Sequence, residues 1–377
     1  MRILYTAVDT PIPGTDGGSV HVQELCLALA RRHHDIQVVA PRGVDQRSPP
    51  AGLVVRRLRR PPRFFEWTAA GQIRHIAQDF EPDVIVDRFY TFGGGGIWAA
   101  HQAGIPAVLE VNSPARPYPG SWRDGLDRLS LLRPVDRWRR QVLDWSDAVY
   151  TTSVHLVPPR LQAAVTVVTN GVDIERFRPG PTRSNPPLCG VYASSFRAWH
   201  GAEDLVEAVR LCVARGVELE IICLGEGPRL AAARQAADRA DLSGAIRFVG
   251  RVPFAEVPGY LAAADVGLAP FDPKAFSALK LGWFWSPIKI FEYLAAGLPV
   301  VTIDIEEMHR LLPSSVARFY PPGDAEALAT TLEYWATNRT VLREAGAEAR
   351  RLAVSRYSWD QQASAVEQVL REAVTRV

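Results

Sequence analysis

The feature that most constrains the fold is a regular alternation of short β-branched runs with amphipathic stretches along almost the entire chain. The stretches have helical spacing, as in Ser19–Arg32, where Leu25 and Leu29 share one face. The strands predicted in the first half are Arg2–Val8, Asp35–Ala40, Leu53–Leu58, Asp83–Asp87, Ala107–Val111, Ala148–Thr152 and Val165–Thr169. Those predicted in the second half are Leu188–Ala193, Leu219–Leu224, Ile246–Val249, Asp265–Ala269, Pro299–Ile303 and Val316–Tyr320. Such alternation predicts an α/β fold of parallel sheets with helices on both faces.

A segment rich in helix and strand breakers, residues 179–187, interrupts the alternation and predicts a linker. A chain of 377 residues is also too long for one ordinary core. We therefore expect two doubly wound, Rossmann-like domains, residues 1–178 and 188–356, followed by a C-terminal segment, residues 357–377, that contains a last helix, Trp359–Arg376. Ligands of such sheets bind beyond the carboxyl ends of the strands, so a cleft between the domains is the expected site.

Composition excludes several classes of protein. Hydrophobic residues make up 47% and charged residues 22%, which is typical of a globular chain. The net charge of +2 argues against a dedicated nucleic-acid binder. No apolar run is long enough for a transmembrane helix, and no signal peptide precedes the first strand. The four cysteines lack metal-binding spacing and are expected to be reduced core residues of a cytoplasmic protein.

The loop after the first predicted strand contains Gly17 and Gly18 and leads directly into a helix. Glycines let the backbone approach a ligand, Asp16 or Ser19 can cap the helix, and free N–H groups would then favour a phosphate. An ordinary flexible turn is the alternative. His21 lies in the first helical turn and is either a ligand contact or a structural histidine. The run Gly93–Gly96 is a weaker anion-loop candidate, because close helix packing explains it equally well.

The segment Ser286-Pro-Ile-Lys-Ile-Phe-Glu292 predicts a helix that begins with Ser286 as N-cap and ends at Gly297. Lys289 then lies in the first turn, where the helix dipole disfavours a cation unless an anion binds there too. Glu292 follows one turn later on the same face. An ion pair between them is the alternative, but it is worth only a few tenths of a kcal/mol. We favour Lys289 on phosphate and Glu292 on hydroxyl groups such as those of ribose.

The loop after the first strand of the second domain carries two more candidates, Arg197 and His200. An arginine at this position can bind phosphate through two hydrogen bonds. A solvated surface arginine is the alternative.

These segments together resemble the retaining glycosyltransferases of family 4, which have the GT-B fold, and within them the subgroup with a Ser-Pro-x-Lys-x-Phe-Glu-Tyr donor motif. The resemblance covers essentially the whole chain. It rests on the Gly17-Gly18 loop, Asn170-Gly-Val-Asp173, Phe196-Arg-Ala-Trp-His-Gly201, Leu224-Gly-Glu-Gly-Pro228, Phe248-Val-Gly-Arg-Val252 and the segment 286–301. It also includes Tyr357-Ser-Trp359 before a last helix that, in this fold, packs back on the first domain.

The resemblance implies transfer of a sugar from a nucleotide-diphosphate donor to an acceptor hydroxyl, with retention of configuration. It implies Arg197, Lys289 and Glu292 as the catalytic set. The donor-binding residues implied or proposed are Gly17, Gly18, His200, Gly250, Arg251, Val252, Ser286 and Ile288. The acceptor, a small molecule, a glycan or a lipid-linked molecule, would lie in the first domain, near the candidates His21, Glu110 and Asn112.

Two positions depart from the family pattern. Phe284 stands where the family has a glutamate that contacts the donor sugar, and His200 stands where it has a lysine. Lys289 is expected to restore the positive charge, and His200 to make diphosphate affinity pH-dependent near its reference pKa of roughly 6.5. No metal cluster is evident, and we expect neither a metal nor a cofactor. A nucleotide-sugar epimerase, a pseudo-glycosyltransferase and a catalytically silent sensor remain the alternatives.

Two basic stretches, residues 55–65 and Arg133–Arg140, lie in the first half of the chain. They could contact an anionic membrane or a lipid-phosphate acceptor, which would make the protein peripheral to the inner face of the membrane. A solvated helix face and loop are the alternative.

Overall fold

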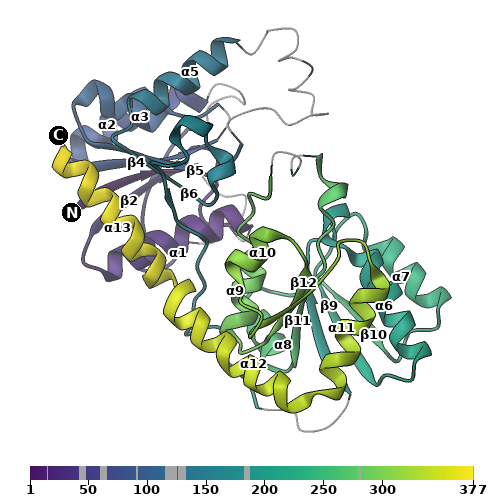
Figure 1. The fold of residues 1–377 in the computed structure, drawn as a ribbon. Helices are drawn as coiled ribbons and strands as arrows, with labels where there is room; N and C mark the ends of the chain where they lie inside the picture. Colours follow the sequence, from purple (N-terminus) through teal and green to yellow (C-terminus); the bar gives the residue numbers. More distant parts are fainter. Residues whose placement is uncertain are drawn as a thin grey trace. The chain divides into compact units, whose positions relative to one another are not determined.

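The computed structural model describes every residue except 15, 42–47, 60–65, 91, 115–124, 126–132, 182–186, 278, 280, 281 and 377. The chain forms two compact units. The first consists of Met1–Gly171, Lys280–Ser286 and Trp359–Val377, and the second of Val172–Leu279 and Pro287–Ser358. Figure 1 shows that each is built on its own sheet.

The sheet of the first unit has the order β3-β2-β1-β4-β5-β6-β7, and its paired strands are parallel. Its strands are β1 (Arg2–Thr6), β2 (Asp35–Ala40), β3 (Val54–Arg57), β4 (Val84–Phe89), β5 (Ala107–Val111), β6 (Ala148–Thr151) and β7 (Thr166–Val167). Its helices include α1 (Gly17–Arg31), α2 (Ala70–Phe80), α3 (Gly95–Ala103), α5 (Arg133–Asp144) and α13 (Trp359–Arg376). Strands β2 and β3 are added on one side of β1, and strands β5 to β7 on the other side of β4. The strand order therefore reverses between the neighbouring strands β1 and β4.

The sheet of the second unit has the order β10-β9-β8-β11-β12-β13 and is also parallel. Its strands are β8 (Leu188–Ala193), β9 (Leu219–Leu224), β10 (Ile246–Gly250), β11 (Val266–Ala269), β12 (Val300–Ile303) and β13 (Ala317–Tyr320). Its helices include α6 (Ala202–Ala214), α7 (Leu230–Arg239), α8 (Val257–Ala262), α9 (Ile288–Ala295), α10 (Glu306–Leu311), α11 (Ala325–Thr337) and α12 (Arg339–Leu352). Here the reversal lies between β8 and β11. The predicted strands are present, with small differences at their ends.

The last helix, α13, completes the core of the first unit. Trp359 and Leu370 of α13 are buried with Ile3 and Tyr5 of β1 and Leu25 of α1 in one hydrophobic cluster. Figure 1 shows α13 in yellow, at the side of this sheet where α1 lies. The apolar face of α13 explains why the chain returns to the first unit after the second is complete.

The boundary between the units differs from the prediction. The first unit ends at Gly171, not at residue 178. The Val172 N–H donates to Tyr357 O at 2.8 Å, and Arg350 Nη1 donates to Phe177 O at 2.8 Å, so these residues are fixed within the second unit. Composition identifies the helix and strand breakers at 179–187, but it does not predict these hydrogen bonds. Of the predicted linker, residues 182–186 lie outside the described residues.

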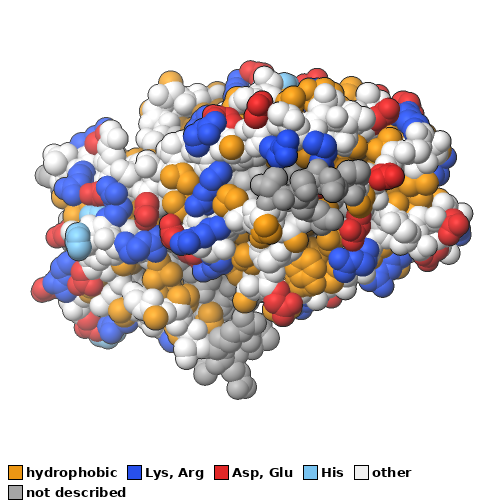
Figure 2. Space-filling view, turned by 90° about the horizontal axis from the view of Figure 1, so that it is seen from below, with side chains coloured by type: hydrophobic (Ala, Val, Ile, Leu, Met, Phe, Trp, Pro, Cys, Tyr) orange, Lys and Arg blue, Asp and Glu red, His pale blue; other side chains and the backbone are white. Residues whose placement is uncertain are grey.

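Burial and charge agree with the composition. The four cysteines are free and buried. No helix in the described ranges is both long and apolar enough to cross a bilayer. On the face that Figure 2 displays, blue and red side chains are interspersed with hydrophobic ones, as expected for a net charge of +2.

Candidate functional site

The start of α9 holds a half-buried lysine whose ammonium group is buried and lacks hydrogen-bond acceptors among the described residues. Lys289 lies in the first helical turn, and its Nζ has no hydrogen-bond partner among the described residues. Nζ lies 5.0 Å from the centre of the Phe271 ring and 5.4 Å from that of Tyr192. Aromatic faces attract an ammonium group but accept none of its hydrogen bonds in the ordinary sense. An anion at the start of α9 would supply the missing acceptors.

Burial brings the pKa of Lys289 down to about 7, although Glu292 opposes the shift. Burial raises the pKa of Glu292 to about 7, against the charges of Arg176 and Lys289. Glu292 is 9% exposed and follows Lys289 by one helical turn. Both groups therefore change protonation near neutral pH, which is characteristic of functional sites.

Lys289 lies at the point of the second sheet where ligands are expected. Tyr192 belongs to β8, and Phe271 follows the end of β11. These two strands are neighbours, but the strands that follow β8 in sequence lie on one side of the pair and those that follow β11 lie on the other. Crevices at such switch points, beyond the carboxyl ends of the strands, bind ligands in doubly wound sheets.

The loop that follows β8 brings Arg197 and His200 to the same edge. Arg197 is exposed, with its guanidinium 5.9 Å above the Trp199 ring. His200 Nδ1 lies 2.8 Å from Ser194 Oγ. Burial, then Lys289 and Arg197, lower the pKa of His200 to about 2. His200 is therefore neutral at physiological pH, which is contrary to the expected titration near its reference pKa.

Gly201 fixes the end of this loop. Its φ is +65°, and a Cβ on it would lie 1.5 Å from Pro270 O. Only glycine fits such a close approach of two backbone segments. The loop carrying Arg197 and His200 is thus held against the residues that follow β11.

The other predicted donor residues of the second unit lie at its carboxyl edge or at the start of α9. Gly250 ends β10 with φ +88°, followed by Arg251 and Val252, and Arg251 Nη1 lies 3.3 Å from Glu226 Oε1. Ile288 is the first residue of α9.

Ser286 was predicted to cap α9, and this was wrong. Pro287 occupies the N-cap position with extended backbone, and no side chain caps the helix. Ser286 instead accepts a hydrogen bond on Oγ from Asn170 N at 2.8 Å within the first unit. Pro287 has φ −75° and ψ 105°, and the helix therefore starts one residue later than predicted.

The two glycine segments of the first unit are already occupied by carboxylates. Gly17 and Gly18 open α1, but Asp16 Oδ1 accepts from Gly18 N at 3.0 Å and from Ser19 N at 3.2 Å. The N–H groups expected to be free are therefore partly used. At the start of α3, Asp87 Oδ2 accepts from Gly96 N at 2.9 Å, so Gly93–Gly96 serves close packing.

Of the three acceptor-side candidates, His21 and Glu110 are structural. Glu110 is 1% exposed and accepts hydrogen bonds from Tyr5, Tyr150 and Asn112, a set that with His21 we call the Glu110 network. His21 Nε2 lies 2.8 Å from Glu110 Oε1, and Nδ1 lies 2.7 Å from Asn170 Oδ1. Neither side chain is free to contact an acceptor. Asn112 is only half-buried and stays a candidate.

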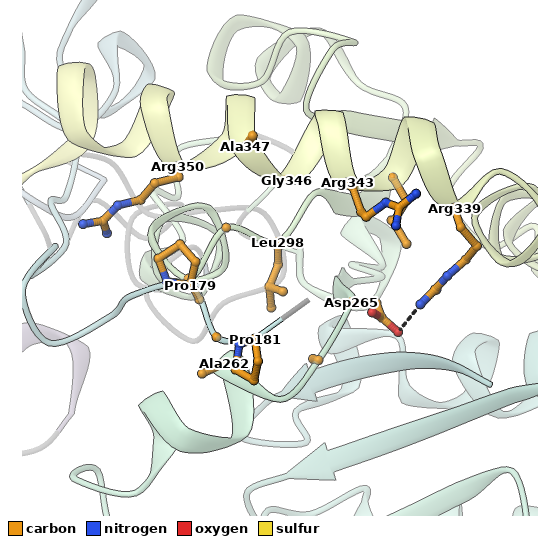
Figure 3. A pocket seen from close by; sticks show the side chains of 15 residues that line it. Pro179, Pro181, Ala262, Asp265, Leu298, Arg339, Arg343, Gly346, Ala347 and Arg350 are labelled. Carbon is orange, nitrogen blue, oxygen red and sulfur yellow. Dashed lines mark ion pairs between the residues drawn. The ribbon is translucent and has the colours of Figure 1, made fainter. Parts of the chain in front are cut away.

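A cavity of about 390 Å³ lies at the opposite edge of the second sheet (Figure 3). Asp265, which precedes β11, and Leu298, which precedes β12, line it together with residues of α12. Within it, Arg339 Nη2 pairs with Asp265 Oδ2 at 3.0 Å. The predicted donor residues follow the strands and do not line this cavity.

Sequence reasoning missed three residues at the switch points. Tyr192 and Phe271, which flank Lys289, lie at strand ends and carry no motif of their own. Arg88 could have been found, because the pair Asp87-Arg88 is a charged interruption in the otherwise apolar run Val84–Phe89.

Comparison with known proteins agrees with this geometry. Residues 16–158 match the family described as "Glycosyl transferase 4-like domain", and residues 189–338 match "Glycosyl transferases group 1". A phosphatidyl-myo-inositol mannosyltransferase of Mycolicibacterium smegmatis is 26% identical over 85% of this chain and 81% of its own. A glycogen synthase of Mycobacterium tuberculosis is 24% identical over 98% and 94%.

Solved structures share the fold. A glycosyltransferase from Rickettsia africae superposes with a TM-score of 0.74 at 15% identity, covering 100% of this chain and 99% of the other. HepE of Anabaena in complex with UDP gives a TM-score of 0.73 at 17% identity, covering 98% and 100%. With the two family matches and two parallel Rossmann-like sheets, the chain belongs to the glycosyltransferases of the GT-B fold, with a family 4-like first domain.

Proposed function

We propose that this glycosyltransferase moves a sugar from a nucleotide-diphosphate donor to an acceptor hydroxyl with retention of anomeric configuration. The observation that carries the proposal is the Lys289 ammonium, buried without a hydrogen-bond partner among the described residues at the switch point of the second unit. A diphosphate supplies the charge and the acceptors that this group lacks. Arg197 would bind the same diphosphate from the loop after β8.

Cleavage of the donor leaves an oxocarbenium-like sugar and a diphosphate oxyanion. Lys289, Arg197 and the N–H groups at the start of α9 stabilise the oxyanion in a poorly hydrated site, where electrostatic effects are large. Glu292 accepts hydrogen bonds from the ribose hydroxyls. Backbone groups of 250–252 read the base, and neutral His200 donates or accepts one hydrogen bond.

Retention is proposed to follow from attack of the acceptor on the face that the diphosphate leaves. The departing phosphate oxygen then takes the acceptor's proton, so no dedicated carboxylate base is needed. Asn112 is the remaining acceptor-side candidate. We also propose that the reaction uses no resident cofactor or metal, and that the acceptor is a small molecule, a glycan or a lipid-linked molecule.

The test is a thermal-shift screen of the full chain against UDP, GDP, dTDP, ADP and their sugars, because a bound nucleotide raises stability with its affinity and concentration. The selected donor is then incubated alone and with acceptors, and the anomeric configuration of the product is determined by NMR. Transfer with retention is expected. Conversion of the donor sugar without an acceptor would favour an epimerase, and binding without turnover a sensor.

Nucleotide affinity is expected to peak near pH 7. Above that pH Lys289, with a pKa of about 7, loses the proton that attracts the diphosphate. Below it Glu292, also with a pKa of about 7, becomes protonated and loses its capacity to accept from ribose. Calorimetric titrations between pH 5.5 and 8.5 measure the profile. His200→Gln is expected to leave its shape unchanged, and a profile that flattens in this variant would contradict the assignment to Lys289 and Glu292.

We further propose that α5 makes a peripheral contact with anionic lipid. Arg133, Arg137 and Arg140 are exposed at helical spacing on this element. Of the other basic stretch, residues 60–65 lie outside the described residues. Co-sedimentation with vesicles rich in phosphatidylserine is expected at low salt and lost at high salt, and reduced in the triple Arg→Gln variant. Equal sedimentation of variant and wild type would mean that this helix face is merely solvated.

A further inference from the structure

Arg88, in β4 of the first unit, is a buried cation with two unsatisfied donor atoms. It is 6% exposed, and its Nε and Nη1 have no hydrogen-bond partner in the described part of the chain. A buried donor left without an acceptor typically costs about 1–3 kcal/mol. An arginine kept at that cost points to an acceptor that arrives with a ligand.

The carboxylate of Glu110, on the neighbouring strand β5, does not provide that acceptor. Glu110 is the β5 partner of Arg88 in the parallel register. Burial lowers the pKa of Arg88, but Glu110, with smaller contributions from Tyr5, Tyr90 and Asp9, outweighs it and keeps the guanidinium charged. Both oxygens of Glu110 are used by the Glu110 network. Glu110 thus offsets the charge of Arg88 without satisfying its N–H groups.

Arg88 also lies at the switch point of the first unit. The sheet reverses between β1 and β4, and Arg88 lies near the carboxyl end of β4. Its Nη2 is 3.4 Å from the position that a Cβ on Gly18 would occupy, at the start of α1. The guanidinium and the positive end of a 15-residue helix therefore meet where this class of sheet binds ligands.

The second unit has the same arrangement at its own switch point. There Lys289 is the buried cation, between the ends of β8 and β11 and in the first turn of α9. Each unit, considered by itself, thus places an unsatisfied cation and a helix start beyond the two strands between which its sheet reverses.

We propose that Arg88 and the start of α1 form an oxyanion subsite in the first unit that binds a phosphate group. The inference rests on the proposed transferase function and extends it. The phosphate belongs either to the acceptor, which would then be a phosphate-bearing molecule, or to the diphosphate of the donor. Planar guanidinium groups match phosphate with two parallel hydrogen bonds, which the ammonium of a lysine cannot reproduce.

Three carboxylates, those of Glu110, Asp9 and Asp16, lie at the subsite and must be accommodated. The negative charge of Glu110 is shared among the donors of its network. Asp9 accepts from Thr10 Oγ1 at 3.1 Å, and burial raises its pKa, with Arg88 opposing the shift. Burial therefore weakens the preference of Asp9 for its charged form. Asp16 already accepts hydrogen bonds from the N–H groups of Gly18 and Ser19 at the start of α1. Arg88 is therefore the main donor of the subsite.

The test titrates inorganic phosphate calorimetrically into the full chain carrying Lys289→Met, which removes the buried cation of the second unit. Phosphate binding is expected in this background, and Arg88→Met is expected to weaken it by at least tenfold. Arg74→Met, at an exposed arginine of α2, is the matched control and is expected to change nothing. Arg88→Lys should recover only part of the affinity. Thermal denaturation of each variant confirms that it is folded.

A second titration distinguishes the two sources of phosphate, in the wild-type background and with the nucleotide that the donor screen selects. Competition with inorganic phosphate, and weaker nucleotide binding in Arg88→Met, identify the donor diphosphate. Simultaneous binding, with nucleotide affinity unchanged in Arg88→Met, identifies a phosphate of the acceptor. Absence of phosphate binding in the Lys289→Met background, or equal binding after Arg88→Met, overturns the subsite. Absence of any nucleotide binding to wild type counts against the proposed function instead.

Discussion

Replacing Lys289 by methionine is expected to stabilise the unliganded protein and to abolish most of its activity. Lys289 buries an ammonium without hydrogen-bond partners among the described residues, and burial already lowers its pKa to about 7. An apolar side chain removes the cost of a buried donor that lacks an acceptor, typically about 1–3 kcal/mol. Loss of one group that stabilises a leaving oxyanion lowers the rate by roughly 100- to 1000-fold. Urea denaturation and initial rates of transfer measure the two effects.

The matched control is Lys274→Met, at an exposed lysine before the same segment. It is expected to change stability by less than about 0.5 kcal/mol and activity not at all. The informative result at Lys289 is a rise in stability together with a loss of activity, because replacing a purely structural lysine would lower both. A variant that is less stable than wild type and still binds nucleotide normally would refute the phosphate role of Lys289.

The fold was predictable because its signal is local. The second strand, Asp35–Ala40, and the first strand of the second unit, Leu188–Ala193, were predicted with the observed bounds, since buried parallel strands are short apolar runs between breakers. The last helix, Trp359–Arg376, was equally clear from the helical spacing of its apolar residues. The fold class then follows from the alternation of these elements.

The site was only partly predictable, because burial and partners are set by tertiary packing. The cation at Lys289 was found from its unfavourable place in a first helical turn. The neutral state of His200 could not be found, since it depends on burial beside Lys289 and Arg197. Glu110 was a candidate because it lies near Asn112, in a segment that the family resemblance assigns to the site. Three of the four residues that surround it, Tyr5, His21 and Tyr150, come from distant positions that no spacing rule connects.

Replacing Glu110 by leucine is expected to destabilise the protein by about 3–5 kcal/mol, the usual effect of removing one partner from a buried charged network. Tyr5, Tyr150 and Asn112 would lose their acceptor, and the charge of Arg88 would lose its offset. Burial raises the pKa of Glu110, but its interactions with His21, Arg88 and Tyr150 outweigh burial and hold the pKa well below its usual value. Its stabilisation is therefore present above the unfolded pKa of roughly 4.3 and is lost as pH falls below it.

Urea denaturation between pH 3 and 7 separates this structural role from a catalytic one. Wild type is expected to lose stability toward acid more steeply than Glu110→Leu, because the variant lacks the carboxylate that must be protonated. Glu372→Leu, at an exposed carboxylate of α13, is the matched control and is expected to change stability by less than about 0.5 kcal/mol. Under conditions where Glu110→Leu is still folded, nucleotide binding should persist, since Lys289 and Glu292 belong to the second unit. A variant as stable as wild type that binds nucleotide but transfers no sugar would return Glu110 to the acceptor site, and the buried network would then have to be regarded as poised for substrate.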